Sequence, residues 1–323
     1  MKKLAFIFAA LLAAVVAGSC GKQQAWNNDD ADSLREADSL AELRQRDSAM
    51  WVGFTSKDLA FFGVHGHVKT LIADGSVYEF DTLGTWSRIN GVDPFHHRMK
   101  NDESDFYYTR NESGYVAGAV FWEYGEEYVW TDGRLTGMNG TEYEYQTHTS
   151  YEYDSLGNVS ATTMLESENE GKTWTKPNKV QYKYTAFDAC RNWTARKSVN
   201  GADYRFIDYY SRNAEVEATQ PAFDPWQRQY VFVGNVGDEK RTPLALSPKG
   251  GLMVVYSGTH FTDVLTFDKG SGRLVVEVRD TDTEQKVGEL NGVVSANGKN
   301  GFRYKGTYRE RGSGSKEFSL VTL

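Results

Sequence analysis

The sequence predicts an all-β protein, and its composition and local patterns both point there. Phe, Trp and Tyr make up 14% of the 323 residues, with only 6 Pro beside 31 Gly. Aromatic residues favour strands, and glycine supplies the backbone freedom that tight turns between antiparallel strands need. From about Leu59 onward, short runs alternate aromatic and polar residues and end in turn signals. We therefore expect a β-meander or short solenoid of hairpins, followed by a small barrel or sandwich.

Composition excludes several classes of protein. An apolar fraction of 40% is sufficient for a hydrophobic core, which excludes disorder along the whole chain. The net charge of −8 argues against nucleic-acid binding, because phosphate contacts need clustered Lys and Arg. No internal apolar run reaches the ~20 residues of a membrane-spanning helix, so no internal transmembrane segment is expected.

The amino terminus has the organisation of a bacterial export signal. Two lysines precede an apolar run from Leu4 to Val16, and small residues lead to Cys20. This arrangement resembles the lipobox of bacterial lipoproteins, with Ala17 where that family usually has Leu. The resemblance implies a signal peptide over 1–19 and lipidation of Cys20, with palmitate as an attached acyl chain. The alternative is a soluble secreted protein with an unmodified cysteine.

Lipidation of Cys20 would have further consequences. Loss of residues 1–19 removes two lysines and takes the net charge from −8 to −10. Cys190 would then lack a cysteine partner, and we expect a buried, inert thiol there rather than a nucleophile. Gly21 follows in place of the Asp that retains many lipoproteins in the inner membrane, so the resemblance implies the outer membrane. Both its periplasmic face and the cell surface stay open.

Residues 20–58 are predicted to form a polar tether. Ser33 and Ser39 each begin a Ser-x-x-Glu capping box, and the apolar spacing predicts a short helix around 33–47. The tripeptide Asp-Ser-apolar occurs around Ser33, Ser39 and Ser48. It resembles the O-glycosylation sequon of envelope proteins in some bacteria, which makes these serines candidate modification sites. The alternative is that Asp and Ser only cap and solvate the helix.

Aromatic hairpin units are predicted over residues 59–212. The clearest copy is YEYDSLGN at 151–158, and weaker copies begin at Tyr78, Tyr107, Tyr128 and Tyr182. Alternating aromatics would bury one strand face, Asp would cap the turn, and Gly would take the positive φ of a tight hairpin. The motif resembles the YD repeat of Rhs-type proteins, which implies a run of β-hairpins. The copies are too few for the cargo shell of large Rhs proteins.

A second β domain is predicted at the carboxyl end. Residues 213–228 contain two prolines and interrupt the hairpin pattern, so we expect a linker there. Residues 229–323 then alternate short apolar runs with glycine-rich turns. The expected strands are 230–236, 243–247, 252–258, 262–268, 273–279, 286–295, 302–309 and 316–323.

No catalytic residue is predicted. The sequence has no nucleophile elbow, zinc-protease helix, P-loop or dinucleotide fingerprint. His65 and His67 are expected on one face of a strand, but no third ligand follows from spacing, so we expect neither a metal nor a cofactor. Glu126 and Glu127 are conceivable as a pair of glycosidase acids, although such charge runs are usually solvated.

Aromatic side chains are the candidates for ligand binding. Tyr and Trp on an open sheet face can stack against sugar rings or form a protein-binding surface. Part of the aromatic cluster over 107–153 is expected to be exposed. The predicted stacking residues are Trp122, Trp130, Tyr143, Tyr145, Tyr151 and Tyr153, with Trp86, Trp174 and Trp193 as further candidates. The alternative is that these rings only pack between sheets.

These observations predict a non-enzymatic, lipid-anchored protein of the outer membrane. Its role would be structural, or the binding of a glycan or an envelope protein, and no nucleic-acid partner is expected. The rival hypothesis is a glycan-processing hydrolase or accessory with a site between the two β domains. Convergent carboxylates or histidines at that junction would favour the hydrolase, and an aromatic face would favour binding. The sequence predicts no oligomeric state.

Overall fold

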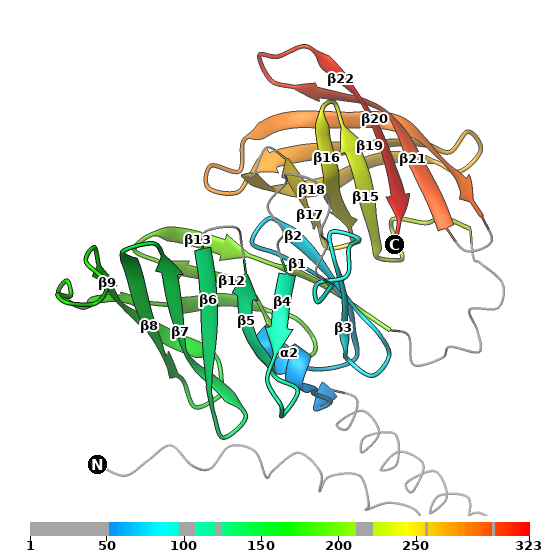
Figure 1. Ribbon diagram of the computed structural model, residues 1–323. Helices are drawn as coiled ribbons and strands as arrows, with labels where there is room; N and C mark the ends of the chain where they lie inside the picture. Colours follow the sequence, from blue (N-terminus) through cyan, green and yellow to red (C-terminus); the bar gives the residue numbers. More distant parts are fainter. Residues whose placement is uncertain (1–51, 97–106, 121–123, 211–221, 256–257, 299–300) are drawn as a thin grey trace, which may run out of the picture. The chain divides into compact units, whose positions relative to one another are not determined.

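The computed structural model confirms the all-β class (Figure 1). It describes residues 52–96, 107–120, 124–210, 222–255, 258–298 and 301–323. Antiparallel meander sheets precede a closed carboxyl-terminal barrel of eight strands. No helix in the described ranges combines the length and the apolarity that a membrane crossing requires. The predicted signal peptide, the helix at 33–47, Cys20 and the tether serines Ser33, Ser39 and Ser48 lie outside the described residues.

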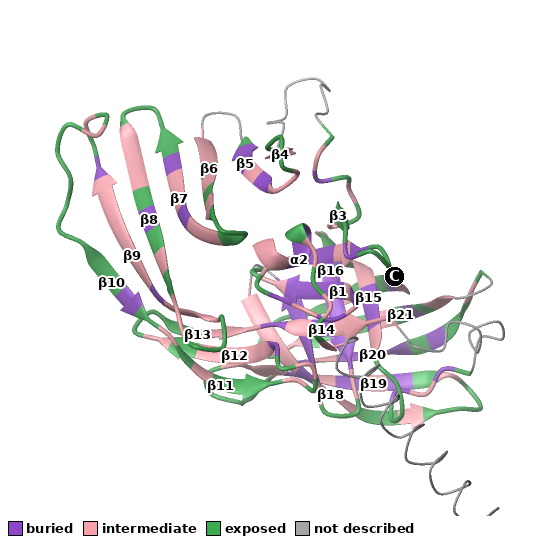
Figure 2. Cartoon of the chain, turned by 90° about the horizontal axis from the view of Figure 1, so that it is seen from below, coloured by how far each residue is buried: buried purple, intermediate pink, exposed green. Residues whose placement is uncertain are grey.

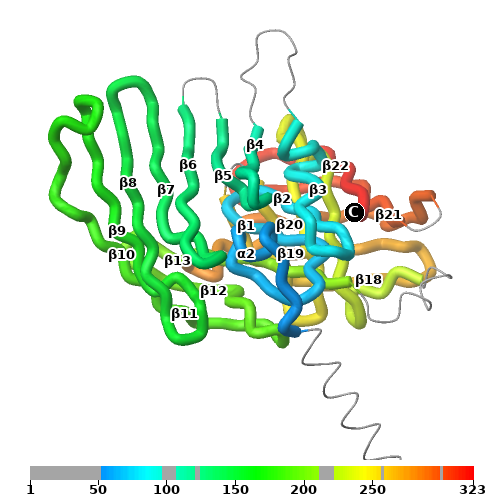
Figure 3. The backbone as a smooth tube through the Cα atoms, turned by 60° about the horizontal axis from the view of Figure 1, so that its bottom comes forward, coloured from blue at the N-terminus to red at the C-terminus, as the bar shows by residue number. Residues whose placement is uncertain are grey.

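The hairpin region folds into three antiparallel sheets. Neighbouring strands are mostly consecutive in the sequence because short turns join them. The second of these sheets, sheet B, spans residues 107–181, and Figure 3 shows its strands side by side in chain order. Sheet A contains β1 (Val68–Ala73), β2 (Ser76–Phe80), β3 (Trp86–Ile89) and β14 (Phe206–Tyr209). Sheet B contains β4 (Tyr107–Arg110), β5 (Val116–Val120), β6 (Tyr124–Thr131), β7 (Arg134–Glu142), β8 (Tyr145–Tyr153), β9 (Val159–Ser167) and β10 (Asn178–Gln181). Sheet C contains β11 (Lys183–Phe187), β12 (Trp193–Ser198) and β13 (Gly201–Tyr204).

Four five-residue turns in these sheets share one hydrogen-bond pattern, at 81–85, 111–115, 154–158 and 188–192. The first residue, Asp or Asn, donates its amide to the fifth carbonyl and accepts the fifth amide on its side chain, at 2.8–3.0 Å. The fourth residue has a positive φ, as the motif predicts. The unit beginning at Tyr128 differs, because Asp132 and Gly133 form a two-residue hairpin turn with φ of 51° and 75°.

A short helix and a buried ion pair fix the first core. Helix α2 (Lys57–Phe61) begins after Ser56, whose hydroxyl accepts the Leu59 amide at 3.0 Å. Asp58 is buried, accepts the Trp86 amide at 2.8 Å, and binds both Nη atoms of Arg110 at 2.6 and 2.7 Å. Because every oxygen of this carboxylate is matched by a donor, a charge is tolerated beside the buried rings.

Strand β14 pairs with β1, the first strand of the hairpin region. The register places Ile207 opposite Leu71, and both side chains are buried. This pairing joins segments that lie more than a hundred residues apart. Local turn signals do not predict it, because no turn connects the two strands.

The carboxyl-terminal strands confirm the predicted second β domain and form a closed barrel rather than a sandwich. The observed strands are β15 (Tyr230–Val236), β16 (Glu239–Leu246), β17 (Gly251–Val255), β18 (Gly258–Asp268), β19 (Arg273–Asp280), β20 (Lys286–Asn297), β21 (Gly301–Glu310) and β22 (Ser315–Thr322). The barrel closes because β15 pairs with both β16 and β22.

The barrel interior is a packed core. Phe232, Tyr304 and Phe318 are almost fully buried inside it, and the Tyr304 hydroxyl lies 3.0 Å from the Leu274 carbonyl. Phe223, from the segment predicted as a linker, packs on this core as well. Eight strands leave an interior just wide enough for side chains, and here they fill it. The barrel is therefore a structural unit rather than a chamber for a ligand.

A third buried cluster joins the hairpin sheets to the barrel. It combines Ile72 and Val77 of sheet A with Val231, Ala245 and Val254 of the barrel. All of these residues are at most 8% exposed. Figure 2 shows the corresponding parts of β1, β15 and β16 in the colour of buried residues. Apolar side chains of barrel strands therefore point outward onto sheet A as well as inward.

Candidate functional site

One face of sheet B concentrates tyrosines. Successive residues of a strand point to opposite sides, so Tyr124, Glu126 and Tyr128 share a face of β6. Glu126 lies opposite Gly140 in β7, and Gly140 lies opposite Thr147 in β8. Alternate residues of β8 therefore lie on the same face. We call this surface the tyrosine face and define it by Tyr124, Glu126, Tyr128, Trp130, Tyr145, Tyr151 and Tyr153.

The tyrosine face is only partly buried (Figure 2). Tyr145, Tyr151, Tyr153 and Trp130 have intermediate exposure. Tyr143, at the β7–β8 turn, is 67% exposed. The expectation that part of the aromatic cluster is exposed is therefore confirmed.

The other aromatic candidates differ in their surroundings. Trp86 is 2% exposed and packs against Phe62 and Tyr108, so its predicted role as an accessible stacking residue is wrong. Trp174 is 44% exposed, but it lies outside the strands, in the connection between β9 and β10. Trp193 is held between Arg196 and Arg205 at 4.6 and 3.8 Å from its ring centre. Trp122 lies outside the described residues.

Helix α2 covers one end of the tyrosine face. The ring of Phe61 lies 4.9 Å from that of Tyr128 and 6.4 Å from that of Trp130. The described residues make no ring contact with Tyr145 or Tyr151 in β8. The face is thus supported at β6 by the hydrophobic core.

Glu126 is the charged centre of the tyrosine face. Its carboxylate accepts hydrogen bonds from the hydroxyls of Tyr124, at 3.1 Å, and Tyr128. Burial and the negative charge of Glu126 raise the pKa of Tyr124 to about 12. Burial, with smaller effects from Tyr153 and Glu126, raises the pKa of Tyr151 to about 12. These hydroxyls therefore stay protonated at neutral pH and remain hydrogen-bond donors.

A glycine and a second carboxylate extend this arrangement. A Cβ atom on Gly140 would lie 2.8 Å from the Tyr124 hydroxyl and 2.5 Å from Thr147 Oγ1. The glycine therefore makes room for the Tyr124 side chain to lie across β7. In β9, Glu166 accepts a hydrogen bond from the Tyr145 hydroxyl at 2.7 Å. Tyrosine hydroxyls thus bind carboxylates at two points of the face.

Glu126 and Glu127 do not form the acid pair considered from the sequence. They are consecutive in β6 and point to opposite sides of sheet B. Glu127 is exposed, and its carboxylate lies 3.4 Å from Asn139 Nδ2. Two carboxylates on opposite faces of a sheet cannot act on one glycosidic bond.

His65 and His67 also fail to share a strand face. They precede β1, and Gly66 between them has a φ of 89°, which breaks the alternation. Nε2 of His65 donates to the Cys190 carbonyl at 2.5 Å, whereas the ring of His67 stacks on Phe54 at 3.9 Å. The predicted same-face pair is therefore wrong. In the described ranges no group of His, Cys, Asp and Glu is placed to hold a metal ion.

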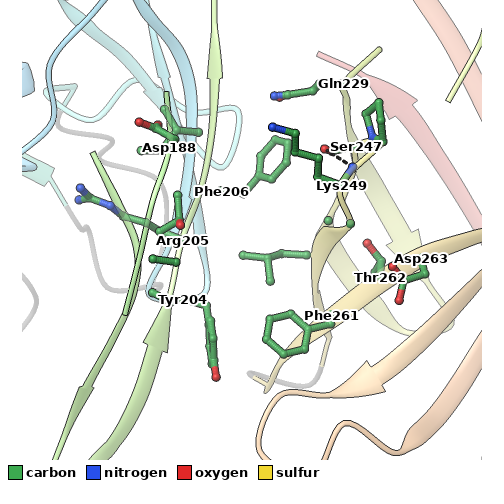
Figure 4. Close-up of a pocket in the computed structure, with 18 of the residues that line it drawn as sticks. Asp188, Tyr204, Arg205, Phe206, Gln229, Ser247, Lys249, Phe261, Thr262 and Asp263 are labelled. Atoms are coloured by element: carbon green, nitrogen blue, oxygen red, sulfur yellow. Dashed lines mark hydrogen bonds between the residues drawn. The ribbon is translucent and has the colours of Figure 1, made fainter. Parts of the chain in front are cut away.

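A cleft of about 850 Å³ lies where the hairpin sheets meet the barrel (Figure 4). Tyr204 of β13 and Phe261 of β18 close one end, with ring centres 4.8 Å apart. Lys249 and Gln229 lie at another part of its lining. Cys190 contributes to the lining and has intermediate exposure, so the predicted burial of this cysteine is wrong.

The aspartates of this cleft are occupied by structural contacts. Asp188 accepts the amides of Cys190 and Asn192 at 2.9 Å on one oxygen and the Tyr209 hydroxyl on the other. Asp263 forms an ion pair with Arg279. Both carboxylates thus have partners that hold the turn at 188–192 and the β18–β19 pairing.

Sequence reasoning identified the tyrosines of β8 but did not include Tyr124, Glu126 and Tyr128. The signal was present, because Tyr-x-Glu-x-Tyr-x-Trp over 124–130 places four side chains on one strand face. Comparison with models of protein families gave no match, and no curated protein matches the chain.

Proposed function

We propose that this protein is a lipid-anchored component of the bacterial outer membrane that binds a glycan on the tyrosine face without catalysing a reaction. The observation that carries the proposal is the partial exposure of the aromatic rings on this face of sheet B. Aromatic rings that remain accessible to solvent on a rigid sheet are typical of binding surfaces, because their burial in a hydrophobic core would be favourable.

The chemistry of the face suits sugars. Tyrosine rings offer flat apolar surfaces for stacking and lose little conformational entropy on binding. The carboxylates of Glu126 and Glu166 and the hydroxyl of Thr147 offer hydrogen-bond partners for sugar hydroxyls on the same face. Backbone amides in the interior of a sheet are already paired with neighbouring strands, so recognition there must use side chains.

The opposite face of sheet B supports this assignment by contrast. It carries Glu127, His148 and Glu152, which are exposed, and Lys179 of β10 forms an ion pair with Glu152 at 2.5 Å. Such a polar surface is the ordinary solvated side of an antiparallel sheet. Within β6 to β9 the aromatic side chains are therefore confined to one side.

The cleft beside the barrel supports binding over hydrolysis as the role of the protein. A glycosidase needs two carboxyl groups that are available to the substrate, one as acid and one as base or nucleophile. Asp188 and Asp263 are both engaged in hydrogen bonds or an ion pair. In the proposed arrangement Cys20 carries the anchor, and the polar residues that follow it, up to about residue 51, hold the folded part away from the membrane.

The proposal is tested with the full chain carrying Cys20→Ala, so that the protein can be purified without lipid. Calorimetric titration with a panel of bacterial envelope oligosaccharides should detect binding to this protein. Tyr151→Ala and Tyr145→Ala should weaken it by about fivefold, because an aromatic contact contributes about 1 kcal/mol. Trp226→Ala is the matched control, since Trp226 is 48% exposed outside sheet B. Absence of binding, or equal losses in all three variants, would contradict the proposal.

A further inference from the structure

Three glutamates share the tyrosine face, and none of them is paired with a cation of the described residues. Glu126 and Glu166 lie on it through the ladder Glu126, Gly140, Thr147, Glu166, whose members are opposite one another in successive strands. Glu142 lies on it because it is opposite Tyr124 in β6 and Tyr145 in β8. None of the three forms an ion pair with a described residue.

The partners that these carboxylates do have are neutral. Glu126 is bound by the hydroxyls of Tyr124 and Tyr128, and Glu166 by that of Tyr145. Arg134 is at the opposite end of β7 from Glu142, where its guanidinium lies 4.6 Å from the centre of the Tyr153 ring. The tyrosine face therefore carries its negative charges on β6, β7 and β9, at the end of the sheet away from Arg134.

The opposite face of the same strands differs in part. Glu152 in β8 is paired with Lys179 in β10 at 2.5 Å. Glu127 on that side has Asn139 as its partner at 3.4 Å. One of these two exposed glutamates is thus neutralised by a lysine, whereas none of the three on the aromatic side has an ion pair with a described residue. Carboxylates of like charge on a partly desolvated surface repel one another, and a bound cation relieves that repulsion.

Tyrosine rings add to the attraction for a cation. The electron-rich faces of aromatic rings stabilise an ammonium group by about 0.5–2 kcal/mol, more when water is displaced. Here Tyr124, Tyr128 and Tyr151 lie on the same face as Glu126, so one ammonium group can meet a carboxylate and a ring together. A neutral sugar would stack on the rings and form hydrogen bonds, whereas an amino sugar would add an ion pair with a carboxylate.

On these grounds we propose that the tyrosine face selects a cationic glycan, one whose amino sugars carry free rather than acetylated amino groups. This inference rests on the proposed function and names the class of glycan. Glu126 in β6 and Glu166 in β9 are separated by three strand spacings, or ~14 Å, so a ligand that reaches both must be an oligosaccharide. The sugar hydroxyl groups beside the ammonium groups would bind Thr147, which lies between Glu126 and Glu166 in this ladder.

The test compares two ligands that differ only in charge. Full chain carrying Cys20→Ala is titrated calorimetrically at slightly acidic pH with glucosamine oligosaccharides and with N-acetylglucosamine oligosaccharides of the same length. We expect the free-amine oligomer to bind at least tenfold more tightly. The difference should shrink in high salt, because screening weakens charge interactions, and at alkaline pH, where the sugar amines lose their protons.

Adjacent residues of β6 provide matched variants. Glu126→Gln should remove most of the tenfold preference, and Glu127→Gln, on the opposite face, should leave it intact. Glu166→Gln is a second variant in a different strand and should reduce the preference too, so a folding defect in one protein does not decide the result. Circular dichroism and melting temperature verify that each variant is folded.

The outcomes separate the two proposals. Equal affinity for both oligosaccharides overturns the selectivity and leaves glycan binding in place. Lack of binding to either these or any other envelope glycan overturns both. Oligolysine of similar charge is the remaining arm: if it binds as tightly as the glucosamine oligomer, with the same loss in Glu126→Gln, the occupant is a basic peptide and the glycan assignment is wrong.

Discussion

At Arg191 the backbone has a φ of 65°, the left-handed conformation that the three related turns give to Gly84, Gly114 and Gly157. The turn at 188–192 nevertheless has the same hydrogen bonds as the others. An L side chain in this conformation costs about 1–2 kcal/mol, and the surrounding hydrogen bonds must hold it there. The side chain of Arg191 itself is exposed.

We therefore expect Arg191→Gly to stabilise the protein. Relief of the strain is partly offset by the greater flexibility of glycine in the unfolded chain, which leaves a gain of about 0.5–1 kcal/mol. Urea unfolding measures the change in the free energy of unfolding. Arg191→Ala is the control, because it removes the charge and keeps the strain, so it should not stabilise. A similar gain in both variants would show that the charge, not the backbone, was responsible.

The buried and partly buried tyrosines of sheets A and B determine how these sheets respond to alkaline pH. Burial raises the pKa of Tyr78 in sheet A to about 12, and the pKa of Tyr124 and Tyr151 in sheet B is also raised to about 12. An unfolded tyrosine ionises near pH 10. The folded state therefore favours the neutral phenol, and this contribution is complete below about pH 10 and is lost as pH rises from 10 to 12.

Stability should thus fall steeply only in the alkaline range. Each such tyrosine lowers the free energy of unfolding by about 1.4 kcal/mol per pH unit between its unfolded and folded pKa values. Urea unfolding at a series of pH values, with tyrosinate absorbance followed in parallel, measures this slope. Tyr151→Phe has one titrating group fewer and should show a shallower slope. If wild type and Tyr151→Phe fall in parallel, Tyr151 does not have the raised pKa.

For the molecule as a whole, anchoring decides where the tyrosine face would meet its ligand. The described part of the chain is one compact unit, held together by the cluster of Ile72, Val77, Val231, Ala245 and Val254. The proposed anchor at Cys20 lies outside it. Acyl chains contribute about 0.8 kcal/mol per buried methylene, so more than one chain is needed for a stable attachment.

Palmitate labelling of cells tests the anchor. Wild type should incorporate label and fractionate with the outer membrane, whereas Cys20→Ala should lose both properties. Cys190→Ala is the matched control, because the chain has 2 Cys in total and this variant keeps only the proposed anchor. It should be labelled as wild type is. Label that persists in Cys20→Ala would rule out this cysteine as the lipidation site.

Local patterns predicted much of this fold. The eight strands of the barrel lie close to their expected ranges, because alternating apolar residues and glycine turns are encoded by neighbours in the sequence. The turn chemistry at 154–158 was predictable for the same reason. For the candidate site, the alternation of residues in β8 predicted Tyr145, Tyr151 and Tyr153 as stacking residues. The partial exposure expected for the aromatic cluster was confirmed.

The sequence by itself determined the strands, their turns and the aromatic character of the hairpin region, since each depends on residues a few positions apart. Tertiary structure alone decided that Trp86 is buried, that β14 pairs with β1, and that β15 meets β22 to close the barrel. It also decided that Glu126 lies among tyrosines while Glu127 faces the other way. These outcomes depend on contacts between distant segments, whose formation is governed by chain closure and packing rather than by local propensity.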